Sequence, residues 1–300
     1  MVDVVSDPDF RCGTVALVGR PNVGKSSLLN RILGQKISIV THKAQTTRHR
    51  IHGIHTIPGA QIVFIDTPGF HKAGNALGRY MVQKARGAVE DADVVVLVTD
   101  ATRWTGEDQA VLDAIRGSGR PVGWVLNKVD RVQPRSRLLT ALAEGRERAD
   151  FAFVVPLSAR QGDNITALEQ ELVSHLPISP PMVEEDIPTD RSERFLAAEC
   201  VREQLLLHLH DELPYGMTVD LEQFKRTEKG LELGAVIWVA KDSHKGMVIG
   251  RQGEQLKRIG RAARLEIREQ WQEPVFLSLW VKVRENWADE PVWLTRLGYD

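Results

Sequence analysis

The chain has 300 residues, 42% of them hydrophobic and 26% charged, so we expect one or two globular domains rather than a disordered chain. No apolar run approaches the roughly 18 residues of a membrane span, and the acidic N-terminus lacks the form of a signal peptide. Two cysteines are too few for a disulfide framework or a metal site, and we expect free thiols in a reducing cytoplasm. The net charge is −1, yet residues 241–270 carry eight Lys/Arg and four Asp/Glu.

A glycine-rich loop, Gly19–Ser26, fits the phosphate-loop pattern of glycine, four residues and Gly-Lys-Ser. An apolar, β-rich run (14–18) precedes it and a helix-like run (27–33) follows it, which is the context that the motif requires. Backbone N–H groups and the helix N-terminus would then hold phosphates. Lys25 would reach the β and γ phosphates, and the Ser26 hydroxyl would bind Mg²⁺. A chance glycine loop is the alternative that this context disfavours.

Two β-like runs, 51–57 and 61–65, surround a Pro-Gly turn, and the second ends in Asp66-Thr67-Pro68-Gly69. An α/β sheet places metal-holding carboxylates at the carboxyl ends of its strands, so we expect Asp66 to contact Mg²⁺ through water. The Gly69 N–H can approach the γ-phosphate. Taken alone the tetrapeptide would be an ordinary turn, but it follows the phosphate loop by about 40 residues, which favours a nucleotide site.

A tetrapeptide that discriminates between bases, Asn127–Asp130, follows a buried strand at 122–126. The Asp130 carboxylate can accept hydrogen bonds from N1–H and the 2-amino group of guanine, and adenine lacks both donors. Asn127 can tie the loop together and contact the base, and the Lys128 stem can lie over the base plane. Alone this motif is weak, and a solvated loop is the alternative; its order after the other two motifs makes it strong.

The remaining pattern of this region alternates strands with helices and predicts a doubly wound, mostly parallel α/β sheet. After a strand at 151–155, the backbone of Ser158 and Ala159 could close over the base. The further predicted elements are a strand at 94–98 and helices at 107–116, 135–148 and 165–175.

Four prolines and four acids in 176–190 exclude a continuous helix, so we place a domain boundary there. We expect Asp190 to cap a helix over 191–208. The predicted organisation is a tail at 1–12, a nucleotide-binding domain at 13–176, a linker at 177–190 and a second, smaller α+β domain at 191–300.

The second domain contains the run Val248-Ile249-Gly250-Arg251-Gln252-Gly253, followed by a basic helix at about 254–270. Val-Ile-Gly-x-x-Gly is the signature of a KH fold, whose glycine loop clamps the backbone of four nucleotides; a tight turn at a helix start is the alternative. Strands are predicted at 217–224, 231–240 and 275–284, with a terminal helix near 289–297. The candidate RNA-binding residues are Ile249, Gly250, Arg251, Gln252, Gly253, Lys257, Arg258 and Arg261. We expect single-stranded RNA and an affinity that falls with salt.

Nearly all of 10–300 resembles the bacterial Era family of GTPases, and residues 14–175 look like a translation-factor-type GTPase domain. The helix, strand, strand, loop, helix, strand order resembles the prokaryotic type II KH arrangement. The matching motifs for phosphate, switch II, base and base closing are Gly19–Ser26, Asp66–Gly69, Asn127–Asp130 and Ser158–Arg160. The resemblance adds Thr47 as the switch I Mg²⁺ ligand, with the adjacent Thr46 as the alternative. It implies GTP contacts at Gly19, Asn22, Val23, Gly24, Lys25, Ser26, Ser27, Asp66, Gly69, Asn127, Lys128, Asp130, Ser158 and Ala159.

One departure from the Ras-like pattern concerns hydrolysis. Phe70 stands where a Ras-like enzyme has the glutamine that orients the attacking water. We therefore hypothesise that intrinsic GTP hydrolysis is slow and that a partner or K⁺ completes the catalytic site. Asn22 either helps hold K⁺ near the phosphates, as in some relatives, or only stabilises the loop turn. The implied catalytic set is Lys25, Thr47, Gly69 and Asn22.

The resemblance implies a switch that binds GTP and GDP and hydrolyses GTP. It also implies binding to single-stranded 16S rRNA near its 3′ end and a role in 30S subunit assembly and rRNA processing. We expect a monomer in the cytoplasm, with peripheral association with the inner leaflet of the cell membrane. One alternative is an RNA-binding chaperone with a structural nucleotide site, although Lys25, Asp66 and Asp130 are all retained. Another is a membrane-associated signalling GTPase, which leaves the KH segment unexplained.

Overall fold

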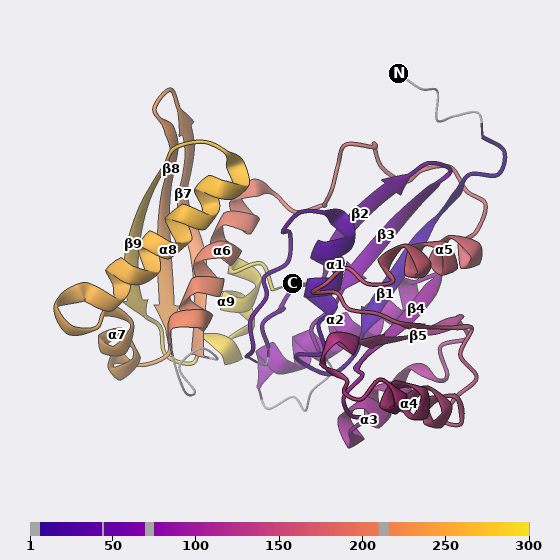
Figure 1. Ribbon diagram of the computed structural model, residues 1–300. Helices are drawn as coiled ribbons and strands as arrows, with labels where there is room; N and C mark the ends of the chain where they lie inside the picture. Colours follow the sequence, from indigo (N-terminus) through magenta and orange to yellow (C-terminus); the bar gives the residue numbers. More distant parts are fainter. Residues whose placement is uncertain (1–6, 44, 70–74, 210–215, 300) are drawn as a thin grey trace. The chain divides into compact units, whose positions relative to one another are not determined.

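The computed structural model describes residues 7–43, 45–69, 75–209 and 216–299, which Figure 1 draws in colour along the chain. They divide into two compact units. The first contains most of the chain up to Asp190. The second begins at Arg191, and two short earlier segments, Ile39–Thr46 and the start of helix α2, group with it. Phe70 and Tyr215 lie outside the described residues.

The first unit is built on a six-stranded sheet of order β2-β3-β1-β4-β5-β6, in which only β2 runs antiparallel to its neighbour. Its strands are β1 (Arg11–Val18), β2 (Ile51–Ile57), β3 (Ala60–Asp66), β4 (Val94–Asp100), β5 (Val122–Asn127) and β6 (Phe153–Pro156). Its helices are α1 (Lys25–Leu33), α2 (Ala76–Asp91), α3 (Gly106–Ile115), α4 (Ser136–Arg146) and α5 (Ile165–His175), with a short 3₁₀ turn, η2 (Val129–Arg131).

The inner strands of this sheet are buried on both faces, which explains their continuous apolar sequences. Every residue of β3 is buried, and so are all of β4 except its last. Helices α2, α3 and α4 share one hydrophobic cluster with alternate residues of β1, β4 and β5, while α1 and α5 contact β1, β2, β3 and β6. All the parallel strands therefore end at one edge, where the loops carrying the predicted motifs lie together.

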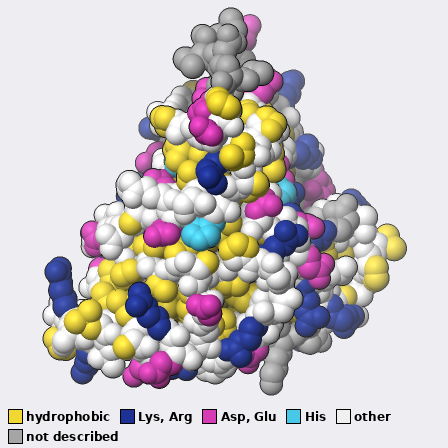
Figure 2. All heavy atoms as spheres, turned by 90° about the vertical axis from the view of Figure 1, so that its right-hand side faces the viewer, with side chains coloured by type: hydrophobic (Ala, Val, Ile, Leu, Met, Phe, Trp, Pro, Cys, Tyr) yellow, Lys and Arg dark blue, Asp and Glu magenta, His cyan; other side chains and the backbone are white. Residues whose placement is uncertain are grey.

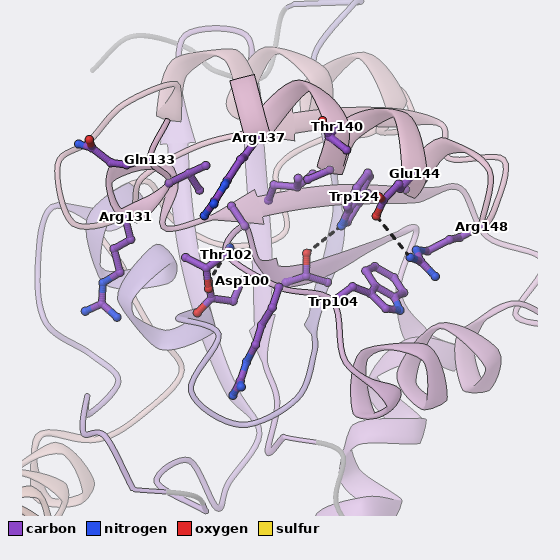
Figure 3. A pocket seen from close by; sticks show the side chains of 17 residues that line it. Asp100, Thr102, Trp104, Trp124, Arg131, Gln133, Arg137, Thr140, Glu144 and Arg148 are labelled. Carbon is purple, nitrogen blue, oxygen red and sulfur yellow. Dashed lines mark hydrogen bonds and ion pairs between the residues drawn. The ribbon is translucent and has the colours of Figure 1, made fainter. Parts of the chain in front are cut away.

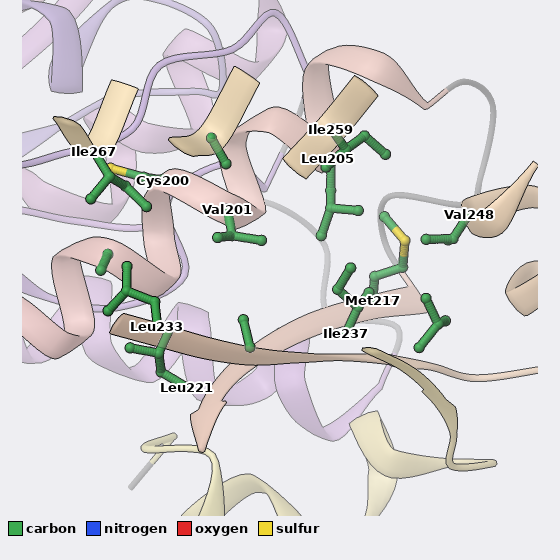
Figure 4. Close-up of a cluster of buried hydrophobic side chains, with 14 of the residues drawn as sticks. Cys200, Val201, Leu205, Met217, Leu221, Leu233, Ile237, Val248, Ile259 and Ile267 are labelled. Carbon is green, nitrogen blue, oxygen red and sulfur yellow. The ribbon is translucent and has the colours of Figure 1, made fainter. Parts of the chain in front are cut away.

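The second unit has a three-stranded sheet of order β7-β8-β9, antiparallel between β7 and β8 and parallel between β8 and β9. Its elements are α6 (Glu193–His208), β7 (Met217–Thr227), β8 (Gly230–Val239), α7 (Asp242–Ile249), η4 (Arg251–Gly253), α8 (Glu254–Trp271), β9 (Val275–Val283), η5 (Trp287–Asp289) and α9 (Pro291–Arg296). Figure 4 shows its core, where Val201 and Leu205 of α6 meet Leu233 and Ile237 of β8 and Ile259 of α8.

Most elements lie where the sequence predicts them, and β2 and α5 match residue for residue. Helices α2 and α7 were not predicted. Helix α2 contains two glycines, which weaken a helical pattern, and α7 has only eight residues. Val248 and Ile249, the first two residues of the predicted KH signature, therefore belong to α7. The prediction of Asp190 as a helix cap is also wrong: Ser192 caps α6, accepting the Phe195 N–H, and Asp190 accepts the His52 N–H.

None of the helices in the described ranges is long and apolar enough to cross a membrane. The face of the molecule in Figure 2 carries basic and acidic side chains singly, with apolar areas between them and no broad field of one sign.

Candidate functional site

The phosphate loop joins β1 to α1, and its glycines are required by close packing. A Cβ added at Gly19 would lie 2.3 Å from the Val98 carbonyl oxygen, and one at Gly24 would lie 2.3 Å from Asn127 Nδ2. Gly24 also has φ 101°, a left-handed conformation that side chains rarely adopt. The loop is therefore pressed against the carboxyl ends of β4 and β5.

Lys25 is the first residue of α1, and its side chain folds back over the loop. Its Nζ donates to the carbonyl oxygens of Gly19 at 2.9 Å and Arg20 at 3.1 Å. Burial lowers the pKa of Lys25 to about 8, because the charged form is poorly solvated there. An ammonium held in this way gains its best partner when a phosphate enters the loop.

Asp66 lies at the end of β3, in a cluster of hydroxyl groups. Its Oδ2 accepts from the hydroxyls of Ser26 and Ser38, each at 2.7 Å, and Thr47 Oγ1 is 2.9 Å from Ser26 Oγ. Burial raises the pKa of Asp66, although the Ser38 hydrogen bond and the Lys25 charge oppose that shift. Its Oδ1 is buried with no hydrogen-bond partner among the described residues.

This cluster fits a magnesium ion. Its atoms are carboxylate and hydroxyl oxygens, which hard divalent cations prefer, and a buried carboxylate oxygen is left without a donor among the residues that the structure describes. Thr47 lies in the cluster, whereas the Thr46 hydroxyl donates to the Lys43 carbonyl oxygen at 2.7 Å. Ser38 was not predicted, because a serine 12 residues after the loop has no motif of its own. Gly69 lies by the phosphate loop, since a Cβ there would be 3.1 Å from Pro21.

Asn127 connects three loops at the base side of the site. Its Nδ2 donates to the Val23 carbonyl oxygen at 2.8 Å, and its Oδ1 accepts from the N–H groups of Lys128 at 2.7 Å and Ala159 at 3.0 Å. The side chain is buried. The phosphate loop, the base tetrapeptide and the Ser158–Arg160 segment are thereby fixed to one another through a single amide.

The other two base residues are also positioned by hydrogen bonds. Ser158 Oγ donates to Asp130 Oδ1 at 2.7 Å, which orients the carboxylate. Lys128 Nζ donates to Asp100 Oδ2 at 2.8 Å and to the Asn22 carbonyl oxygen at 2.5 Å. Burial favours a higher pKa for Asp100, but the hydrogen bonds from Lys128 and Thr102 and the Lys128 charge together outweigh burial and lower that pKa below its ordinary value.

A buried ion pair braces the phosphate loop from the outside and was missed in the sequence. Arg20 Nε lies 3.0 Å from Asp108 Oδ2, and both side chains are buried. Asp108 also accepts from the Thr105 N–H, closing a capping box at the start of α3. The Thr105-x-x-Asp108 spacing could have revealed this cap, but nothing in the sequence pairs it with Arg20.

The second candidate site, the Gly250–Gly253 loop, lies in the other unit and has few supporting contacts. Gly250 and Gly253 have φ of 72° and 79°, and a Cβ on Gly250 would lie 2.5 Å from Gln255 Cβ. Arg251 and Gln252 are exposed. On α8 the basic residues Lys257, Arg258 and Arg261 are exposed, while Ile259, Ala263 and Ile267 are buried in the core.

Comparisons with known proteins agree with both halves of the chain. Residues 14–128 match the family model described as 50S ribosome-binding GTPase, and residues 212–288 match that of the KH domain. GTPase Era of Stenotrophomonas maltophilia (strain K279a) is 47% identical over 96% of this chain and 97% of its own length. GTPase Era of Pseudomonas syringae pv. syringae (strain B728a) is 48% identical over the same shares.

Two solved structures resemble the whole chain. A single-substitution variant of Aquifex aeolicus Era bound to GDP·AlF4⁻ superposes with a TM-score of 0.93, at 38% identity over 97% of this chain and 99% of that one. Era in complex with MgGDPNP and nucleotides 1506–1542 of 16S ribosomal RNA gives the same score and coverage at 37% identity. The expected P-loop GTPase and KH folds are thus confirmed, and the chain belongs to the Era family of GTPases.

Proposed function

We propose that this GTPase uses its nucleotide state to control binding of single-stranded 16S rRNA near the 3′ end, and so assists 30S subunit assembly and rRNA processing. The observation that carries the proposal is the presence in one chain of the phosphate-loop, Asp66–Gly69 and Asn127–Asp130 motifs together with an exposed Gly250–Gly253 loop that carries Arg251. The Era structure solved with MgGDPNP and a 16S rRNA fragment supports it by similarity.

In the proposed nucleotide site, each group has a separate task. Lys25 contacts the β and γ phosphates, and Ser26, Thr47 and Asp66 hold Mg²⁺, which neutralises phosphate charge when bound. Asp130 reads guanine, and Asn127 and Lys128 shape its pocket. Gly69 presents its N–H to the γ-phosphate. The remaining GTP contacts are Gly19, Asn22, Val23, Gly24, Ser27, Ser158 and Ala159.

Potassium is a separate part of the proposal. Asn22 has φ 64° and its carbonyl oxygen accepts from Lys128, which supports a turn role, while its position in the loop supports K⁺ coordination. The hydrolysis rate of the wild type in KCl and in NaCl at equal ionic strength distinguishes them. A wild-type rate at least about tenfold higher in KCl than in NaCl, together with no such increase in Asn22→Ala, supports the K⁺ site. Equal wild-type rates in the two salts would support a turn role for Asn22 and contradict K⁺ coordination.

In the proposed RNA site, Gly250–Gly253 lets phosphates approach the backbone closely, while Arg251, Lys257, Arg258 and Arg261 supply charge. Ile249 and Gln252 complete the contact surface. We assign residues 13–176 to the GTPase domain, 177–190 to the linker and 191–300 to the KH domain. The proposal places the chain in the cytoplasm as a monomer whose partner is the 30S subunit. Flotation with anionic vesicles tests the further expectation of peripheral membrane binding.

The central experiment measures affinity for a 16S rRNA 3′-end fragment across a salt series, with a nonhydrolysable GTP analogue and with GDP. Tighter binding in the GTP-analogue state, at several salt concentrations, is the expected result. Lys25→Ala, which should not hold the nucleotide, is expected to show no difference between the two. Equal wild-type affinities in both states would contradict the switch and leave a chaperone whose nucleotide site is structural.

A further inference from the structure

A pocket of about 290 Å³ opens on the first unit, beside the base-binding loop but separate from it (Figure 3). It lies between the β4–α3 connection, β5, the segment after η2, and α4. None of the residues assigned above to GTP, Mg²⁺ or RNA lines it. Its volume is at the lower end of the range for small-molecule sites, roughly 300–1,000 Å³.

One wall of the pocket is aromatic and firmly held. The rings of Trp104 and Trp124 meet edge to face with centroids 6.0 Å apart, and Trp124 stacks on Phe151 at 5.3 Å. The Trp124 indole N–H donates to Thr99 Oγ1 at 2.9 Å. Gly145 of α4 leaves room for this ring, since a Cβ there would lie 1.8 Å from it. The Trp124 side of the wall is therefore fixed on a strand and not on a loop.

The rest of the rim is rich in arginine. Arg103, Arg131 and Arg137 all line the pocket, and within the described residues none of their guanidinium groups makes a hydrogen bond or an ion pair. Figure 3 shows Arg137 reaching from α4 toward Thr102 and Asp100.

The two carboxylates of the rim already have partners. Asp100 is paired with Lys128 at 2.8 Å, and Glu144 lies 3.9 Å from Arg148. Arg148 itself lies over the Trp104 ring, 4.8 Å from its centroid. The pocket rim therefore carries three exposed cations that nothing within the described residues neutralises, and a ligand would meet the partly exposed Trp104 ring, since Trp124 is 2% exposed.

We propose that this pocket binds a small planar aromatic carboxylate. A guanidinium group presents a planar fork that matches a carboxylate with two hydrogen bonds, and a flat ring gains contact against the partly exposed Trp104 ring. A volume of about 290 Å³ accommodates a bicyclic ring with one carboxylate and is too small for a nucleoside triphosphate.

The test uses the full chain and isothermal titration calorimetry with three probes. 2-Naphthoate carries both the ring and the charge, 2-naphthalenemethanol carries only the ring, and acetate carries only the charge. One molecule of 2-naphthoate per chain should bind, with an affinity at least about tenfold above either of the others. Equal affinity for the acid and the alcohol, or no saturation below about 10 mM 2-naphthoate, would overturn the proposal.

Variants locate the site. Arg131→Gln and Arg137→Gln should each weaken 2-naphthoate binding by about fivefold to tenfold. Arg135→Gln removes the same charge two residues before Arg137, from a side chain that is exposed and does not line the pocket, and should change nothing. Ala141→Trp should block the pocket. GDP affinity reports that each variant is folded. Equal losses in Arg135→Gln and Arg137→Gln, or full binding in Ala141→Trp, would place the ligand elsewhere.

Discussion

The two glycine-rich loops of this chain differ in how they are supported. Around Gly19–Ser26, buried polar groups bond one another, with Asn127, Asp66 and the Arg20–Asp108 pair bracing the loop from three sides. Around Gly250–Gly253 the two glycines fix the course of the backbone, while the side chains of Arg251 and Gln252 are exposed to solvent. A network of buried polar groups would reject wrong ligands, since mismatched buried groups are costly, whereas an exposed, charged loop would accept many phosphodiester backbones.

The largest expected effect comes from removing Asp130, the carboxylate that we propose reads the base. Asp130→Asn should weaken GTP binding by about 100-fold, because guanine loses its acceptor while Ser158 still bonds the amide. Xanthosine triphosphate, which has a carbonyl in place of the 2-amino group, should recover part of the loss. Competition binding measures both. Asp163→Asn, an exposed neighbour, is the control, and unchanged preference between GTP and xanthosine triphosphate would contradict the base-reading role.

RNA binding at the Gly250–Gly253 loop should depend on the charge of the loop and not on a network of buried hydrogen bonds. Arg251→Glu with Gln252→Glu should weaken rRNA-fragment binding by about 10- to 100-fold and flatten its salt dependence, while GTP hydrolysis is unchanged. Filter binding over a salt series and a phosphate-release assay provide the two readouts. Lys229→Glu with Gln223→Glu makes the same charge change on the β7–β8 hairpin. A similar loss in that control would mean that overall charge, not the loop, sets affinity.

Burial of the Lys25 ammonium in the phosphate loop of the nucleotide-free protein should lower the free energy of unfolding. The pKa of Lys25 falls from 10.5 to about 8 on folding, so the folded state binds this proton less tightly than the unfolded state. The resulting destabilisation is complete below pH 8 and disappears as pH rises from about 8 to about 10.5. Nucleotide-free Lys25→Met should therefore be more stable than wild type by about 1–3 kcal/mol at pH 7, with a smaller gain at pH 9.5.

Urea unfolding of the nucleotide-free proteins at the two pH values measures this gain. Arg86→Met removes an exposed charge from α2 and serves as the control, and its effect on stability should be the same at both pH values. A Lys25→Met variant less stable than wild type at pH 7 would show that burial of the ammonium is fully compensated by its two carbonyl acceptors.

The smallest expected effect concerns Ser38. Ser38→Ala removes one donor to Asp66 Oδ2, so the pKa of Asp66 should rise further and protons should compete better with Mg²⁺. Mg²⁺-dependent GDP affinity should fall by about fivefold at pH 7, and by more at pH 6. Ser174→Ala, near the end of α5, is the matched control. A loss that does not grow on acidification would argue against a role through the carboxylate.

What the sequence could predict depended on whether a function requires contiguous residues. The phosphate loop, Asp66 and the Asn127–Asp130 tetrapeptide could be proposed from the sequence because each motif is continuous and lies at a strand end. Ser38 and the Arg20–Asp108 pair were missed because they become neighbours only through the fold. Helix α7 was missed because it has only eight residues and its last ones were assigned to the glycine motif, and Asp190 was taken for a cap that Ser192 provides.

The amide of Asn127 has a consequence for how the two halves of GTP would bind if they were offered as separate molecules. One side chain bonds the loop that would hold the phosphates, the loop that would read the base and the segment that closes over it. Ordering any one of the three reduces the freedom of the others, so part of the entropy cost for one half of the ligand is met when the other half binds. Guanosine and pyrophosphate, offered as separate molecules, should bind this protein cooperatively.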